Sequence, residues 1–381
     1  MNPILIIGAG MAGYGVLREF RKRDADTPVT LITADDGRVY SKPNLSNALA
    51  QKRSPAQLAA MDAAKAADTY RARILTETRV MAIDPAGHAV STDGGDLAYG
   101  RLVLALGADP FSHGLAGEAA DDVFTVNDLT DYALFRAALE GKRRVVILGG
   151  GLIGCEFAND LLLGGHEVSV VHLGGWPLER LVPEPAGRAL ADALAARGVD
   201  WHFGRTGRTV ERAGEGYVLT LDDGSRVRAD LILSAIGLRP RTGLARAAGI
   251  ETDRGIVVDR GLCTSTEDVY AVGDCAQLEG LVLPYVQPLL IQARALAATL
   301  AGEPTPLAYP AMPVVVKTSL HPVAVQPPPM GAAGHWRVEG DGEGIRALFL
   351  APDGGLLGFA LTGRHTGERA RLAEQVPPML A

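Results

Sequence analysis

The sequence has few cysteines and no long uncharged apolar run. Its three cysteines, Cys155, Cys263 and Cys275, are far apart in the sequence. No disulfide scaffold is therefore expected, and the protein is expected to be cytoplasmic. The most apolar long stretch, 281–302, contains two prolines, two glutamines and an arginine, which predicts a core helix after a turn and no membrane span. The chain starts directly with an apolar strand, without a basic region or cleavage site, so no targeting segment is expected.

An excess of basic residues is also missing. The formal net charge is −7, which argues against nucleic acid as a partner, because binding a phosphate backbone needs surplus lysine and arginine. No group of histidines and cysteines has the spacing of a metal site, so no metal is expected. With 381 residues, 47% of them hydrophobic and 21% charged, the chain should fold into two or three globular domains.

Two βαβ units are visible in the pattern of apolar residues. The first has a strand at 4–7, a glycine-rich turn, a helix at about 12–23 and a strand at 29–33. The same order returns about 140 residues later. There the strand spans 145–148, the turn 149–154, the helix 152–163 and the next strand 168–171.

Both turns carry the sequence G-x-G-x-x-G, at 8–13 and at 149–154. In such a loop the first glycine allows a tight turn, the second lets the backbone approach a pyrophosphate, and the third lets the helix pack on the strand. Two loops imply two dinucleotides, a bound flavin and a nicotinamide donor. The predicted flavin contacts here are Gly8, Gly10, Met11, Ala12 and Gly13, and the predicted nicotinamide contacts are Gly149, Gly151, Leu152, Ile153 and Gly154.

The acidic residue that usually binds the adenosine ribose is missing from both strand ends. The first strand ends in Thr33-Ala34, with two aspartates just beyond, and the second ends in His172. We expect His172 to contact a ribose or to be solvated. Because Arg180 is the only cation near that strand end, a clamp for a 2′-phosphate has little support, and NADH is favoured over NADPH.

Further motifs identify a family. The segment 264–274, which ends in Val-Gly-Asp, and the segments 104–108 and 235–240 resemble the second FAD signature and the two connecting motifs of the pyridine-nucleotide-dependent flavoprotein reductases. The resemblance covers about the first 300 residues, and it implies that Asp274 holds the ribityl chain of FAD. It further implies FAD contacts at Thr33, Ala34, Val80, Ala105, Gly107 and Gly273, and a nicotinamide contact at Gly237.

The segment 40–46 narrows the resemblance. It is similar to a motif of reductases that supply small iron–sulfur proteins, at a place where disulfide reductases carry two cysteines, so a dithiol relay is excluded. The resemblance implies that Lys42 lies beside the flavin and pairs with Glu156, both being catalytic and in contact with FAD. It also implies that Lys317 is a second cation there, and that backbone N–H groups near Val286 face the flavin carbonyl.

The segments 31–37, 151–160 and 313–318 are similar to those of the bacterial NADH:rubredoxin reductases. This resemblance implies that NADH passes a hydride to FAD and that single electrons then leave to the partner rubredoxin. The predicted fold is α/β, with two Rossmann-like dinucleotide-binding domains and a small C-terminal α/β domain. The predicted limits are 1–112 with 241–309 for the FAD domain, 113–240 for the NAD domain and 310–381 for the C-terminal domain.

Three alternatives remain open at this point. The first is an NADH-dependent reductase of a [2Fe–2S] ferredoxin in an oxygenase system, although its tail is usually longer than the one here. The second is an oxidase or a peroxide-reducing enzyme, which usually needs a redox cysteine near the flavin, and none is near Lys42. The third is a flavin-bearing signalling or binding protein that NADH only switches. The tail has as many acidic as basic residues, so the sequence does not place a docking surface for rubredoxin.

Overall fold

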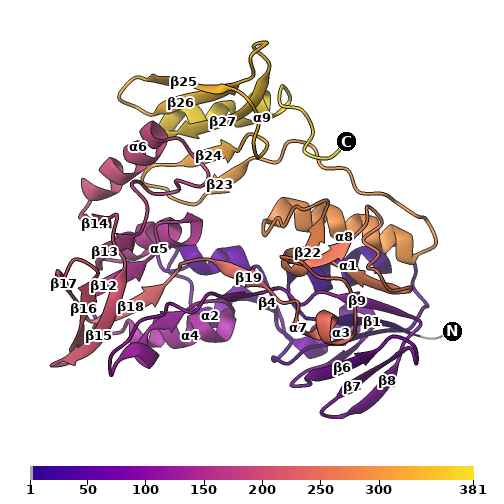
Figure 1. The fold of residues 1–381 in the computed structure, drawn as a ribbon. Helices are drawn as coiled ribbons and strands as arrows, with labels where there is room; N and C mark the ends of the chain where they lie inside the picture. Colours follow the sequence, from indigo (N-terminus) through magenta and orange to yellow (C-terminus); the bar gives the residue numbers. More distant parts are fainter. Residues whose placement is uncertain (1–2) are drawn as a thin grey trace.

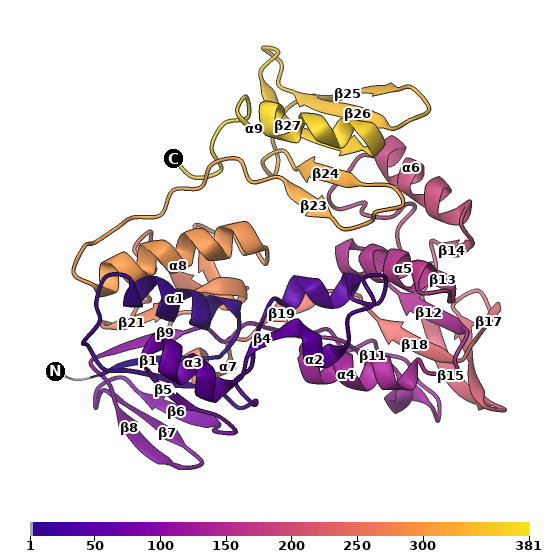
Figure 2. The ribbon, with the colours of Figure 1, turned by 180° about the vertical axis from the view of Figure 1, so that it is seen from behind.

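The computed structural model describes residues 3–381 and contains three five-stranded sheets. Two α/β units lie side by side, and the third sheet lies above the second unit (Figures 1 and 2). This arrangement confirms the predicted fold class. Within the described residues no helix is both long and apolar enough to cross a membrane.

The first sheet is parallel, with the strand order β21-β9-β1-β2-β5. β1 and β2 are buried along their whole length, as expected of parallel strands with both faces covered. Helices α1 (Met11–Arg21) and α8 (Val286–Leu300) pack side by side on this sheet (Figure 1). The strands are β1 (Ile4–Ile7), β2 (Val29–Ile32), β5 (Arg73–Leu75), β9 (Arg101–Leu104) and β21 (Val269–Ala271).

The second sheet repeats the design, in the order β11-β18-β12-β13-β14, again with every pair parallel. Helix α5 (Leu152–Leu163) follows β12 as α1 follows β1. The strands are β11 (Phe124–Thr125), β12 (Arg144–Leu148), β13 (Glu167–His172), β14 (Val199–Phe203) and β18 (Leu231–Ser234). The other helices of this half are α4 (Leu129–Ala138) and α6 (Glu184–Ala195).

Each unit also carries a three-stranded antiparallel sheet, and the units are joined by a short ribbon. The ribbon is β10 (Ala108–Pro110) paired with β19 (Leu238–Pro240), so the two predicted connecting motifs lie against each other. Strands β9 and β18 each end three residues before a glycine, Gly107 and Gly237, whose positive φ turns the chain. The added sheets are β6 (Val80–Asp84), β7 (Ala89–Thr92) and β8 (Gly95–Ala98), and β15 (Gly207–Ala213), β16 (Gly216–Leu221) and β17 (Arg226–Ala229).

The third sheet is antiparallel, in the order β23-β24-β27-β26-β25, and it belongs to the C-terminal part of the chain. One face packs on α6, and the other is covered by the short helix α9 (Arg369–Ala373). Its strands are β23 (Val314–Val316), β24 (Val323–Gln326), β25 (His335–Gly340), β26 (Ile345–Leu350) and β27 (Leu356–Thr362).

One hydrophobic core joins three distant parts of the sequence. It contains Phe157 of α5, Leu45 from the 3₁₀ helix η1 (Lys42–Asn47) and Val316 of β23. Because these residues share one core, the second unit holds the η1 segment and the third sheet in fixed positions. The remaining elements are β3 (Val39–Tyr40), α2 (Pro55–Leu58), β4 (Ala59–Met61), α3 (Ala63–Tyr70), η2 (Ala120–Asp122), α7 (Gly243–Ala247), β20 (Ile256–Val258), η3 (Gly273–Cys275), β22 (Ala276–Leu278) and η4 (Gly363–Glu368).

Candidate functional site

The first glycine loop joins β1 to α1 and needs glycine at two positions for steric reasons. Gly8 has φ +113°, and a Cβ there would lie 2.2 Å from the carbonyl oxygen of Ala105. A Cβ at Gly13 would lie 1.9 Å from the carbonyl oxygen of Gly8. At Gly10, by contrast, a Cβ would have no neighbour within 4 Å, so this side of the loop is open for a close approach.

The second loop, between β12 and α5, has the same geometry. A Cβ at Gly149 would lie 2.6 Å from the carbonyl oxygen of Ala235, and one at Gly154 would lie 1.8 Å from that of Gly149. A Cβ at Gly151 again has no neighbour within 4 Å. Helices α1 and α5 begin without a side-chain cap, so their first N–H groups are free to bind an anion. Both loops therefore fit a dinucleotide pyrophosphate.

The other predicted contacts are at the same ends of the strands. In the first unit, a predicted FAD contact follows each of four strands within two residues: Gly8 after β1, Thr33 after β2, Ala105 after β9 and Gly273 after β21. These four residues therefore share the carboxyl edge of one sheet. Ligands of such open sheets bind at this edge. Gly107 lies between β9 and β10, Val80 begins β6, and Ala34 follows Thr33. In the second unit Gly151, Leu152 and Ile153 form the start of α5, His172 ends β13, and Gly237 lies just after β18.

Lys42 and Asp274 are brought together by η1 and η3, which are more than 200 residues apart in sequence. Burial lowers the pKa of Lys42, and the charge of Asp274 opposes that shift. Burial likewise raises the pKa of Asp274, which Lys42 opposes. Two residues predicted to touch FAD thus stabilise each other's charges.

Asn127, which the sequence did not single out, fixes the side chain of Lys42. The Nζ of Lys42 donates to Oδ1 of Asn127 over 2.6 Å, and the Asn127 amide donates to the carbonyl oxygen of Ala108 over 3.0 Å. Asn127 lies between β11 and α4 in the second unit. It therefore connects the lysine to the ribbon that joins the units.

The predicted ion pair between Lys42 and Glu156 is wrong, because Glu156 pairs with Lys317 instead. Glu156 is completely buried, and its Oε1 accepts the backbone N–H of Lys317 over 3.0 Å. Its Oε2 accepts both the ammonium of Lys317 and the hydroxyl of Ser46, the latter over 2.6 Å. The reason is the packing of α5: Glu156 faces the end of β23 and Ser46 near the end of η1, whereas Lys42 is at the start of η1.

A double-mutant cycle should detect this pairing. Lys317→Met should lower the free energy of unfolding by about 3–5 kcal/mol, because it leaves the buried carboxylate of Glu156 unpaired. Combining Lys317→Met with Glu156→Gln should recover about 1–3 kcal/mol of that loss. The same cycle with Lys42→Met should show almost no coupling. Thermal and urea unfolding of the FAD-loaded protein would measure both cycles, and coupling to Lys42 alone would contradict the structure.

Two more side chains of α5 bind the neighbouring segments. Asp160 accepts the backbone N–H groups of Leu49 and Ala50, over 3.1 and 2.8 Å, and Asn159 accepts that of Leu320 over 3.0 Å. Both are almost completely buried. Helix α5, which starts at the second glycine loop, therefore holds both the segment after Lys42 and the segment after Lys317.

His172 makes two hydrogen bonds inside the protein, so its ring is not simply solvated, and its predicted contact with a ribose stays a prediction. Its Nδ1 accepts the N–H of Gly150 over 3.1 Å, and its Nε2 contacts the carbonyl oxygen of Trp176, also over 3.1 Å. Burial lowers the pKa of the imidazole, with a weaker opposing effect from Glu179. His172 thus holds Gly150 of the second glycine loop in place.

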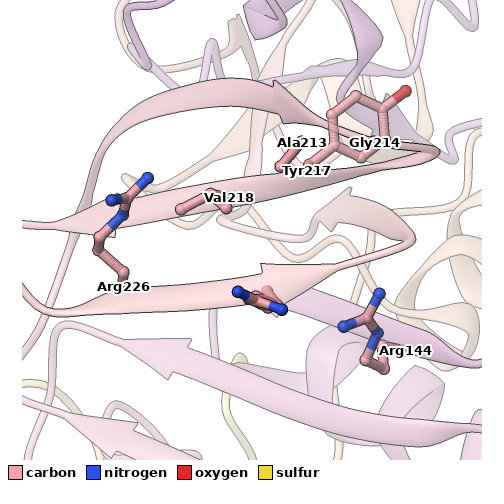
Figure 3. Close-up of a pocket in the computed structure, with 7 residues that line it drawn as sticks. Arg144, Ala213, Gly214, Tyr217, Val218 and Arg226 are labelled. Carbon is pink, nitrogen blue, oxygen red and sulfur yellow. The ribbon is translucent and has the colours of Figure 1, made fainter.

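A separate pocket of about 510 Å³ lies at the opposite end of the second sheet (Figure 3). Arg144 begins β12, whereas Gly149 follows its last residue, so the pocket is at the amino edge and away from both glycine loops. Arg144 itself forms an ion pair with Asp230. The lining residues are Arg144, Ala213, Gly214, Tyr217, Val218, Arg226 and Arg228. The described residues include no group of three or more His, Cys, Asp or Glu that could hold a metal.

The fold and these loops define a protein with two dinucleotide-binding units and an added C-terminal sheet. Residues 2–297 match the family described as pyridine nucleotide-disulphide oxidoreductase, and residues 306–376 match a domain described as the rubredoxin binding C-terminal domain. The chain belongs to the pyridine nucleotide-disulphide oxidoreductase family. Membership implies the use of a flavin and of NAD(H).

Relatives are similar over their full length. The chain is 48% identical over 381 residues to a rubredoxin-NAD(+) reductase of Alcanivorax borkumensis, and the match covers 100% of both chains. It is 44% identical to a rubredoxin-NAD(+) reductase of Acinetobacter baylyi, covering 100% of this chain and 99% of the relative. Among solved structures, a ferredoxin reductase from Rhodopseudomonas palustris has a TM-score of 0.89 at 26% identity, covering 99% of this chain and 96% of that one.

Proposed function

We propose that this chain is an FAD-dependent rubredoxin-NAD(+) reductase, which takes a hydride from NADH and delivers single electrons to rubredoxin. The observation that carries the proposal is the match of residues 306–376 to a rubredoxin-binding domain, in a chain that matches two rubredoxin-NAD(+) reductases from end to end. The two glycine loops would provide the two nucleotide sites that this reaction needs, and the open space at Gly10 and Gly151 supports this.

FAD would be held by the first unit. The open side of Gly10 and the uncapped start of α1 would take the pyrophosphate, and Asp274 would accept hydrogen bonds from the ribityl chain. Bound FAD supplies the conversion of a two-electron donor into a one-electron source. The remaining predicted FAD contacts, Thr33, Ala34, Val80, Ala105, Gly107 and Gly273, stay proposals of the same kind.

NADH would be held by the second unit, with its pyrophosphate at Gly151 and the start of α5. Ile153, in the first turn of α5, is 39% exposed and offers an apolar contact to a ligand in front of the loop. Lys42 would contribute a positive charge where the two units meet, and Asn127 and Asp274 would keep its ammonium in position. The uncapped N-terminus of α8 at Val286 would contribute further N–H groups to the same place.

The third sheet would bind rubredoxin. Its first strand, β23, ends at Val316, and the next residue, Lys317, is bound to Glu156 of the second unit. A partner bound to this sheet would therefore be held in a fixed position relative to both nucleotide units. Val315, which is 50% exposed on β23, offers rubredoxin an apolar contact.

Reduction of a [2Fe–2S] ferredoxin is the second candidate, supported by the ferredoxin reductase of similar fold. The two are separated by measuring NADH-dependent reduction of purified rubredoxin and of a [2Fe–2S] ferredoxin under the same conditions. We expect kcat/KM to be at least about 100-fold higher for rubredoxin, since specific docking contacts distinguish partners by a few kcal/mol. The reverse preference would assign the chain to the ferredoxin reductases and leave its use of FAD and NADH intact.

A further inference from the structure

Strand β13 ends without the acidic residue that usually binds the adenosine ribose of NADH. In folds of this kind an acidic residue at this strand end binds the hydroxyls of the adenosine ribose and rejects a 2′-phosphate. Here the position holds His172, and both of its ring nitrogens are used by the protein. Because Nδ1 accepts the N–H of Gly150, Nε2 carries the proton and donates to Trp176, which makes the ring a neutral structural group.

The loop that follows His172 is bound directly to the second glycine loop. The N–H of Leu178 donates to the carbonyl oxygen of Gly150 over 2.9 Å, and the N–H of Gly204 donates to that of Gly174 over 3.0 Å. Leu178 is buried and has φ +60°, a left-handed conformation that leucine rarely adopts and that the surrounding contacts must hold. The next residue, Glu179, therefore has a defined place near the glycine loop.

The carboxylate of Glu179 turns back towards the strand end. Its Oε2 accepts the N–H of Gly175 over 3.2 Å, and a Cβ at Gly174 would lie within 2.2 Å of both carboxylate oxygens. A side chain at position 174 would therefore displace the carboxylate from this place. In the described part of the chain Oε1 has no hydrogen-bond donor, so it can accept one from a ligand. Burial lowers the pKa of His172, and the charge of Glu179 opposes that shift.

We propose that Glu179 takes the role of the missing strand-end acid: it accepts a hydrogen bond from the adenosine ribose of NADH and repels the 2′-phosphate of NADPH. This inference rests on the proposed use of NADH by the second unit. The nearby cations do not form a phosphate clamp, because Arg205 is paired with Asp223 and Arg180 is a single exposed side chain. Selectivity for NADH would thus come from a carboxylate seven residues beyond the strand end.

The test compares Glu179→Gln with Glu184→Gln, an exposed acid of α6 that pairs with Arg188 and serves as the control. Calorimetric titration of the oxidised, FAD-loaded proteins would give Kd for NAD⁺ and NADP⁺ without any electron acceptor. Steady-state rates with NADH and NADPH, using ferricyanide as acceptor, would add KM and kcat and do not depend on rubredoxin.

For Glu179→Gln we expect the ratio of Kd for NADP⁺ to Kd for NAD⁺ to fall by about tenfold or more, with kcat for NADH almost unchanged. Weaker NAD⁺ binding and tighter NADP⁺ binding should both contribute, and Glu184→Gln should keep the wild-type ratio. An unchanged ratio, or an equal weakening of both nucleotides, would overturn the inference and leave Glu179 a purely structural residue. Wild-type protein that bound neither nucleotide would overturn the proposed function itself.

Discussion

Replacing Gly151 by valine should strongly impair the use of NADH while leaving FAD bound. A Cβ at Gly151 meets no protein atom within 4 Å, so the substitution should not disturb the fold. It would fill the space through which the pyrophosphate approaches the start of α5. We expect kcat/KM for NADH to fall by at least about 100-fold, since a displacement of the nucleotide by about 1 Å is enough for such a loss.

The matching change in the other unit separates the two sites. Gly10→Val has equally free space around its Cβ, and it should lower the FAD content of the purified protein while preserving its secondary structure. Gly243→Val, at the start of α7, also has no neighbour within 4 Å of the new Cβ and should change neither property. Flavin absorbance, circular dichroism and KM for NADH would be compared. Loss of FAD from Gly151→Val but not from Gly10→Val would show that FAD binds to the second unit and NADH to the first.

Removing the charge of Lys42 should slow the reduction of bound FAD by NADH by about 100-fold, which is the usual cost of losing one electrostatic group at a reacting centre. Lys42→Ala should still bind FAD, because the glycine loop and Asp274 are unchanged. Lys42→Arg should recover part of the rate if the charge is what matters, since arginine keeps it on a differently shaped group.

Asn127 gives this prediction a second test. Asn127→Ala removes the 2.6 Å hydrogen bond to Nζ but keeps the ammonium, so we expect a smaller loss of rate than with Lys42→Ala. Lys65→Ala changes an exposed lysine of α3 and is the control. Rapid-mixing absorbance measurements of flavin reduction would compare the variants. A Lys42→Ala protein reduced at the wild-type rate would remove Lys42 from the mechanism.

Local patterns were enough to predict the repeated architecture. The helix predicted at 152–163 is α5, and the strand predicted at 4–7 is β1. These elements are strongly periodic or uniformly apolar, and the glycine turns mark where they begin and end. The division into three domains and the predicted FAD and NAD contacts remain proposals, although the residues concerned lie at the carboxyl edges of the two parallel sheets.

Partners brought together by tertiary packing could not be predicted in the same way. Glu156 was expected to bind Lys42, but a one-turn difference in position along η1 gives it Ser46, and β23 gives it Lys317. Asn127 and Glu179 lie in loops whose course depends on contacts far away in sequence, such as that of Leu178 with Gly150. The absence of an acid after β13 was the one available signal for Glu179, and it did not indicate where the carboxylate would be found.

The most direct test of the whole account is a rapid-mixing experiment in which NADH meets the FAD-loaded protein together with oxidised rubredoxin. The account predicts that flavin absorbance falls first, that rubredoxin absorbance then falls, and that one NADH reduces two rubredoxins because a two-electron donor supplies single electrons. Flavin that is reduced by NADH but leaves rubredoxin oxidised over many turnovers would contradict it.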